Sequence, residues 1–194
     1  ANKISKCYLV KEGVYNFDKI KSIILKRLHD KKNIRIIKNS PIKSLVDIDK
    51  TVIFKKNNKI TKENFDFIIN ATYSNLNNHI YHMKNKLLME YNLQEMCKLK
   101  INGKRFGSTI LDGEFPSILP VAGSKNEYLF AHVKFSQLIK KVSKKIPNEI
   151  LKEKYVSNLQ QTFDESKKYL SVLNKSKITG NFKVIRSVNV DSQK

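Results

Sequence analysis

The residues that could do chemistry begin where an apolar run stops. Residues 65–69, "FDFII", are followed directly by Asn70, Ala71 and Thr72. A continuous apolar run of this length predicts a strand buried on both faces, as in a parallel sheet. Such a strand ends at the ligand side of an α/β sheet, where its last backbone amides point outward. There Ala71 leaves room for a ligand, Thr72 can donate to a phosphate or ribose oxygen, and Asn70 can bond a neighbouring loop.

Other candidate residues carry weaker signals. His79 and His82 lie three apart, but two imidazoles without a Cys or carboxylate cluster are too few for zinc, so we expect no metal site. His132 lies in an apolar stretch, which is typical of a satisfied core or interface histidine. Residues 112–114, "DGE", predict a hairpin turn.

The formal net charge of +21 raises the question of an anionic partner. Of 38 basic residues only four are Arg, the side chain best suited to bidentate base and phosphate contacts. The lysines are spread over the whole chain, and no aromatic residues interleave with the basic run at 140–154. We therefore favour a general compositional drift toward Lys, Asn and Ile. A basic, non-enzymatic α+β module that binds nucleic acid stays open as the alternative.

The length of 194 residues suits one domain, or one domain with a small annex, and 40% apolar residues can build a core. No apolar run reaches the ~20 residues that span a bilayer, and the first residues do not have the pattern of a signal peptide. Cys7 and Cys97 could pair, but two buried thiols of a cytoplasmic protein are the favoured interpretation.

One amphipathic helix is predicted over residues 16–30. Asn16 can cap it, and apolar residues recur at spacings of three and four. They are Phe17, Ile20, Ile24 and Leu28, with Ile23 and Leu25 widening the stripe. A second helix is predicted from about Pro147 to Leu173.

The remaining predicted elements are strands, and residues 107–133 are expected to form an antiparallel meander. The predicted strands cover residues 7–10, 34–37, 41–48, 51–56, 65–71, 90–101, 107–112, 116–121, 127–133 and 181–190.

Two stretches together resemble the FAD-dependent oxidoreductases related to D-amino-acid oxidase. The first is "NIRIIKNSPIKSL", residues 33–45, followed by "FDFIINATY", residues 65–73. The second is "STILDGEFPSILP" followed by "EYLFAHVKFS". The resemblance covers roughly residues 12–135. It departs at Tyr73, where the family usually has glycine, the residue that permits close backbone approach.

The resemblance implies an α/β to α+β fold, with part of an FAD-binding domain and an antiparallel-sheet substrate domain with flanking helices. The implied parts are residues 1–78, residues 79–180, and a strand at 181–194 that returns toward the FAD domain. Ile42 would lie by the adenine, and the turn from Asn70 to Tyr73 would approach the dinucleotide. The hairpin would bring Asp112, Phe115 and His132 toward a substrate.

The implied reaction is hydride transfer from a small amine or amino-acid-like substrate to flavin, which requires no strong acid or base from the protein. The six glycines form no GxGxxG fingerprint, the usual holder of the FAD pyrophosphate. We therefore expect an interior portion of a larger enzyme, colourless by itself. The substrate and the oligomeric state are not predicted.

Overall fold

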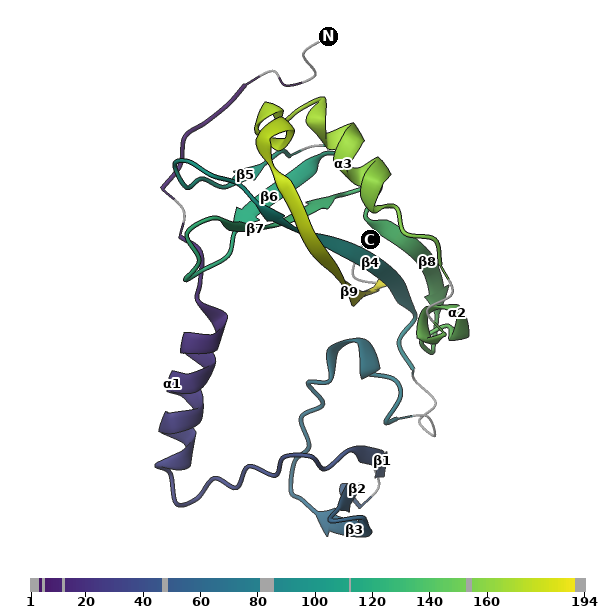
Figure 1. The fold of residues 1–194 in the computed structure, drawn as a ribbon. Coiled ribbons are helices and arrows are strands. Elements are labelled where there is room, and N and C mark those ends of the chain that lie inside the picture. Colours follow the sequence, from purple (N-terminus) through teal and green to yellow (C-terminus); the bar gives the residue numbers. More distant parts are fainter. Residues whose placement is uncertain are drawn as a thin grey trace.

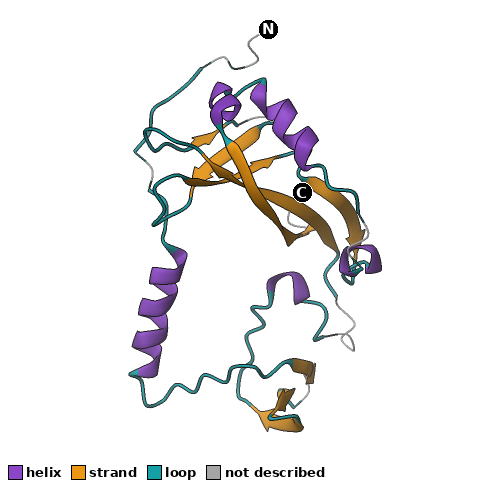
Figure 2. Ribbon diagram, viewed as in Figure 1, coloured by secondary structure: helices purple, strands orange, loops and turns teal. Residues whose placement is uncertain are grey.

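The computed structural model describes residues 4, 6–11, 13–46, 49–80, 86–111, 113–152 and 155–190. The fold is mixed α+β, with two antiparallel sheets and short helical elements (Figures 1 and 2). The predicted α+β class is confirmed. None of the described helices is long and apolar enough to cross a membrane.

Helix α1, Phe17–His29, forms where the sequence predicts it. The side chain of Asn16 accepts a hydrogen bond from the backbone N–H of Lys19 at 2.9 Å, which satisfies one free donor of the first turn. Basic residues in the last turn complement the helix dipole. The apolar stripe, however, covers no core: no residue of α1 is buried, and the exposed fraction of Phe17 is 73%.

The first sheet is a meander of β1 (Ile42–Val46), β2 (Thr51–Lys56) and β3 (Lys59–Asn64). Asn57 and Asn58 form the β2–β3 turn with φ of 48° and 63°, the left-handed conformation of the tightest hairpin turns. Sequence patterning did not predict β3. The strands predicted at 34–37 and 7–10 are wrong, because the structure has no regular element there.

Residues 65–71 differ most from the prediction. The buried strand predicted there is absent: the segment forms no strand, Phe67 is 85% exposed and Ile69 is 91% exposed. The N–H of Phe65 still donates to the carbonyl of Lys50 at 3.1 Å, at the end of the β2–β3 hairpin. Beyond it, no described strand pairs with this segment. An apolar run becomes a buried strand only where neighbours cover it, and the described residues supply none.

The second sheet is built on β4, Met89–Lys100. Strand β9 (Lys177–Asn189) pairs along one edge of β4, and β7 (Glu127–His132) and β8 (Gln137–Ser143) share the other edge end to end. Strands β6 (Pro116–Pro120) and β5 (Ser108–Thr109) extend the sheet beyond β7. The predicted meander and the long strand at 90–101 are thereby confirmed. The division predicted at residue 181 falls inside β9.

One face of this sheet carries the core, because side chains alternate along β4. Its odd-numbered residues are buried, and helical elements cover them (Figure 1). One cluster joins Cys97, Leu99, Ile101, Ile118, Tyr128, Phe130, Phe163 and Leu173, and a second joins Met89, Tyr91, Leu93, Ile146 and Ile150.

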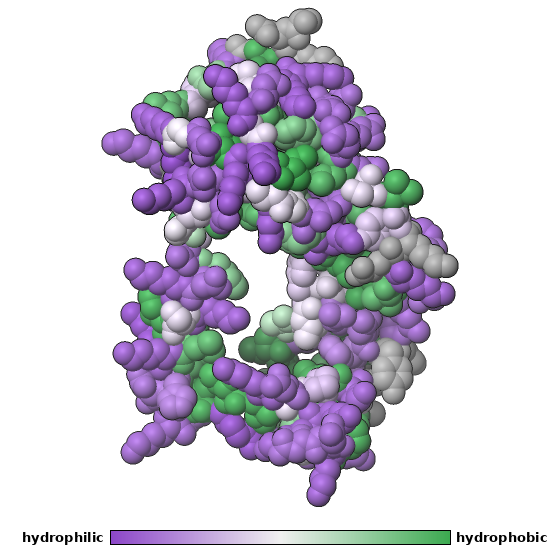
Figure 3. Space-filling model, in the orientation of Figure 1, coloured by the Kyte–Doolittle hydropathy of each residue, from purple (hydrophilic) through white to green (hydrophobic). Residues whose placement is uncertain are grey.

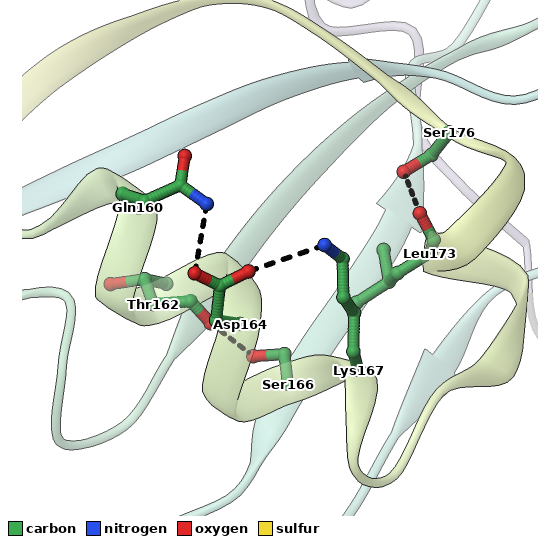
Figure 4. Close-up of polar contacts among 7 residues, drawn as sticks. All are labelled: Gln160, Thr162, Asp164, Ser166, Lys167, Leu173 and Ser176. Carbon is green, nitrogen blue, oxygen red and sulfur yellow. Dashed lines mark hydrogen bonds and ion pairs between the residues drawn. The ribbon is translucent and has the colours of Figure 1, made fainter.

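The single helix predicted over 147–173 is wrong. The structure has α2 (Asn148–Leu151), α3 (Leu159–Lys167) and a 3-10 turn, η2 (Ser171–Lys175). Figure 4 shows the polar contacts of α3: Asp164 accepts from Gln160 Nε2 at 2.8 Å and from Lys167 Nζ at 3.2 Å. The buried Ser166 hydroxyl donates to the carbonyl of Thr162 at 2.6 Å.

Glu95 explains why the helix is interrupted. Its buried carboxylate lies on the core face of β4 and accepts hydrogen bonds from Ser157 Oγ at 3.0 and 2.9 Å and from Asn158 N–H at 3.1 Å. The Asn181 side chain on β9 also donates to it. A buried charge needs such donors. In a continuous helix through 157 and 158, the backbone N–H of Asn158 would instead donate to a carbonyl of the helix and be lost to Glu95.

The cysteines differ in environment. Cys97 is buried as predicted, whereas Cys7 is exposed, so the prediction of two buried thiols is wrong for Cys7. Burial, and then the charge of Glu95, raises the pKa of Cys97 to about 12. The two thiols are not bonded to each other.

Candidate functional site

The turn at residues 70–73 is closed by its own side chains. Asn70 Oδ1 accepts from the Thr72 hydroxyl at 2.7 Å and from the Thr72 backbone N–H at 3.3 Å, and Asn70 Nδ2 donates to the carbonyl of Leu76 at 2.9 Å. This is an Asx-type turn. The predicted Thr72 donor is therefore committed to Asn70, while Ala71 at the tip is exposed.

Tyr73 has a left-handed backbone, with φ of 52°. That conformation is favoured by glycine and is strained for most other residues. Tyr73 begins the 3-10 turn η1, Tyr73–Asn75, and its hydroxyl accepts the backbone N–H of Ser187 on β9 at 3.4 Å. The turn is thus joined to the second sheet through the phenol that stands where the resemblance has glycine.

Asn77 fixes the loop that follows the turn. It is almost completely buried, donates to the carbonyls of Leu87 at 2.7 Å and Lys144 at 3.1 Å, and accepts the N–H of Leu87 at 3.2 Å. The backbone carbonyl of His79 accepts a hydrogen bond from the N–H of Leu45 in β1 at 2.9 Å. These bonds connect the first sheet, the turn and the second sheet. Ile42, the predicted adenine neighbour, is half-buried in β1.

Three buried polar atoms on β4 and β9 have no hydrogen-bond partner among the described residues. The Tyr91 hydroxyl and Ser187 Oγ belong to directly paired residues of β4 and β9, and Asn92 Oδ1 is on the next residue of β4. Burial raises the pKa of the Tyr91 phenol, and the nearby Asn77 side chain opposes that rise. Sequence reasoning gave no signal for this group, because its burial depends on pairing between distant strands.

A separate pocket contains two of the three predicted substrate residues. It has a volume of about 340 Å³, and its lining includes Phe115 at the start of β6 and His132 at the end of β7. The other lining residues are Glu114, Lys134, Phe135, Glu165 and Tyr169. Sequence patterning missed these five, of which Glu165 and Tyr169 come from α3 and the segment after it. Asp112, the third predicted residue, lies outside the described residues.

His132 is 3% exposed and sits at the base of a tight turn. Its Nδ1 accepts the backbone N–H of Lys134 at 3.2 Å, which leaves the proton of a neutral ring on Nε2. Burial lowers the pKa of His132, Glu114 and Glu165 oppose that shift, and Lys134 reinforces it. His132 is buried, as predicted for a core strand residue, and its Nδ1 accepts a backbone hydrogen bond.

Metal and nucleic-acid chemistry gain no support from the geometry. The described residues contain no cluster of three or more His, Cys, Asp or Glu side chains able to hold a metal ion, and His82 lies outside them. Figure 3 shows hydrophilic side chains over most of the visible face rather than gathered in one groove. That distribution is typical of the general lysine enrichment inferred from composition.

Comparisons with known proteins add no relative. No family model, curated protein or solved structure matches this chain.

Proposed function

We propose that this chain forms an interior part of a cytoplasmic FAD-dependent oxidoreductase of the D-amino-acid-oxidase type. The enzyme would take a hydride from a small amine or amino-acid-like substrate. The observation that carries the proposal is the left-handed backbone at Tyr73, with φ of 52°, directly after the Asn-Ala-Thr turn. The resemblance has glycine at this position, and Tyr73 adopts the left-handed conformation that glycine favours.

The exposure of the segment before the turn also supports the proposal. Four of the five residues at 65–69 are apolar, and Phe67 and Ile69 are among the most exposed large side chains of the described residues. The apolar stripe of α1 is also partly uncovered, since none of its residues is buried. Exposed apolar side chains of this number are typical of faces that another segment or partner covers. A neighbouring strand and helix of an FAD-binding domain would cover both.

We propose that the turn forms one edge of the dinucleotide site. Ala71 is exposed and presents only a methyl group, and the Asn70–Thr72 bonds hold the backbone fixed. In the proposal, Ala71 and Thr72 would face the cofactor and Ile42 would pack near its adenine. FAD would supply the hydride acceptor. The described residues contain no glycine-rich phosphate loop, so the turn would contribute only one side of the site.

The test starts from the DNA upstream of Ala1 in the same reading frame. We expect it to encode a strand, GxGxxG, and a helix with an acidic residue about 20 positions later. The product of the longer frame should then carry flavin, seen in its visible absorbance, whereas residues 1–194 alone should be colourless. An in-frame stop directly upstream, or a colourless longer product, would reject the proposal.

A pair of variants of the longer product tests the turn itself. Tyr73→Gly accepts the left-handed backbone, and Tyr73→Val does not, because a β-branched side chain is strained there. We expect Tyr73→Gly to retain flavin and Tyr73→Val to lose most of it. Equal flavin content in the two folded variants would show that this backbone conformation is unrelated to cofactor binding.

A further inference from the structure

Strand β9 forms a long edge of the second sheet. Among the described strands it pairs with β4 alone, along the full length of β4 (Figure 1). The backbone N–H of Ser187 points away from β4, because it donates to the Tyr73 hydroxyl. The pairing is continuous from Asn181 to Asn189, and successive residues of a strand direct their backbone groups to alternate sides. The N–H and C=O groups of Asn181 and Ile185 therefore point outward, as the N–H of Ser187 does.

Outward backbone groups along an edge are what an added strand recognises, because they offer a ready row of donors and acceptors. The Tyr73 phenol covers this edge at Ser187, near the end of β9. From there back to Lys177 no described strand pairs with the outer side of β9, and Thr179 and Asn181 are exposed. This stretch is long enough for a partner segment of about five residues.

The charge of the edge selects among the possible partners. Strand β9 contains Lys177, Lys183 and Arg186 and no Asp or Glu. Lys98 on β4 adds a further ammonium group, whose Nζ lies 5.5 Å from the centroid of the Phe182 ring. Opposite charges on neighbouring strands attract and like charges repel. A second copy of β9 would place basic residues against basic residues, whereas an acidic segment would find a cation at several positions.

The faces of β9 define the other side chains of such a segment. Ile185 packs against the core, so its neighbour Val184 faces the opposite side of the sheet, where it is 38% exposed. An apolar side chain on the added strand would cover Val184, and acidic side chains would lie near Arg186. We propose that β9 binds an extended acidic peptide segment of a partner protein, with apolar and acidic residues in alternation, as an added strand of the sheet.

The experiment uses a capped seven-residue peptide of alternating glutamate and valine, titrated calorimetrically into the 194-residue chain at physiological ionic strength. One matched peptide has lysine in place of each glutamate, and a second keeps the glutamates but carries a methyl group on every internal amide nitrogen. We expect the acidic peptide to bind at least about tenfold more tightly than either control. Equal binding of the N-methylated peptide would overturn the proposal, because charge alone would then explain the affinity.

Amide resonances of the protein locate the added strand without any substitution. The outward N–H groups of Asn181 and Ile185 should shift and gain protection from hydrogen exchange when the acidic peptide is bound. The N–H of Val184 points toward β4 and should change less. Changes confined to other strands, or no binding of the acidic peptide, would reject the proposal.

A pair of charge reversals tests the acidic preference. Arg186→Glu should weaken binding of the acidic peptide about fivefold or more. Lys21→Glu makes the same change of charge at an exposed residue of α1 and should have little effect. Equal affinities of the two variants, both with the circular dichroism spectrum of the wild type, would contradict the proposal. A single-stranded oligonucleotide that binds more tightly than the peptide, and loses its affinity in Arg186→Glu, would also overturn it in favour of nucleic acid.

This inference goes beyond the proposed function and does not depend on it. The backbone groups of Asn181 and Ile185 belong to β9, outside the turn from Asn70 to Tyr73, and the peptide titration contains no flavin. A failed flavin test therefore leaves the peptide result standing, and the reverse also holds.

Discussion

Replacing Glu95 by leucine removes the one carboxylate on the core face of β4. Three donors would lose their acceptor: Ser157 Oγ, Asn158 N–H and the Asn181 side-chain amide. Hydrogen bonds to a charged group contribute about 1.5–3 kcal/mol each, but burying the charge costs several kcal/mol. Ser157 and Asn181 are exposed enough to bind water instead. The remaining cost is about 2–4 kcal/mol, mostly for Asn158 N–H and for the lost anchor of α3.

Glu95→Gln is the matched control, because it keeps the volume and removes only the charge. The Asn181 amide can reverse and accept from the new NH₂ group, while the Gln oxygen still accepts from Ser157 and Asn158. We therefore expect a loss of only about 1 kcal/mol. The order of stability should be wild type, then glutamine, then leucine.

Urea unfolding measures these differences through circular dichroism and tyrosine fluorescence, since the chain has no Trp. The midpoint should fall while the slope stays constant. A leucine variant as stable as the wild type would refute the reasoning, because the desolvation of Glu95 would then outweigh its hydrogen bonds. The charge of Glu95 is also the second cause, after burial, of the raised pKa of Cys97, so both variants should lower that pKa.

Three further predictions follow from burial and hydrogen bonding. A thiol reagent at pH 8 should label Cys7 rapidly and Cys97 only after unfolding, because Cys97 is buried with a pKa of about 12; equal labelling rates would contradict its burial. Burial lowers the pKa of His132, because the folded state favours the neutral ring. The stability that neutral His132 contributes is therefore complete above pH ~6.5 and is lost as the pH falls through the lowered value. Urea midpoints between pH 7 and 5 should decline less for His132→Gln than for the wild type, and parallel declines would argue against this. Asn77→Ala should cost about 2–3 kcal/mol, because the backbone of Leu87 and Lys144 loses buried partners. It should also expose residues 70–80 to limited proteolysis, and an unchanged cleavage pattern would show that other contacts hold this segment.

The helix and strand patterns that depend on near neighbours could be predicted from the sequence. Asn16 and the spacing of Phe17, Ile20 and Ile24 are sufficient for α1, since the cap and the periodicity lie within one helix. The alternation along 90–101 likewise predicts β4. The turn from Asn70 to Thr72 also closes through its own side chains.

The pairing of distant segments decided the rest. Sequence patterning predicted no strand at residues 137–143, yet they form β8, because the edge of β4 supplies hydrogen-bond partners there. Glu95 interrupts the helix predicted at 147–173 by drawing Ser157 and Asn158 into its own hydrogen bonds. Phe115 and His132 were candidates from the sequence, but Glu165 and Tyr169 joined them only through the packing of α3.

The sequence by itself determined the composition, the helix α1 and the strands whose pattern is local. Tertiary structure alone decided what each apolar surface contacts. Residues 65–69 are the clearest case, because their apolar run predicts a buried strand while burial requires a neighbour that the run cannot encode. The pocket around His132 follows the same reasoning, since its charge and shape come from three elements that meet only in the folded chain.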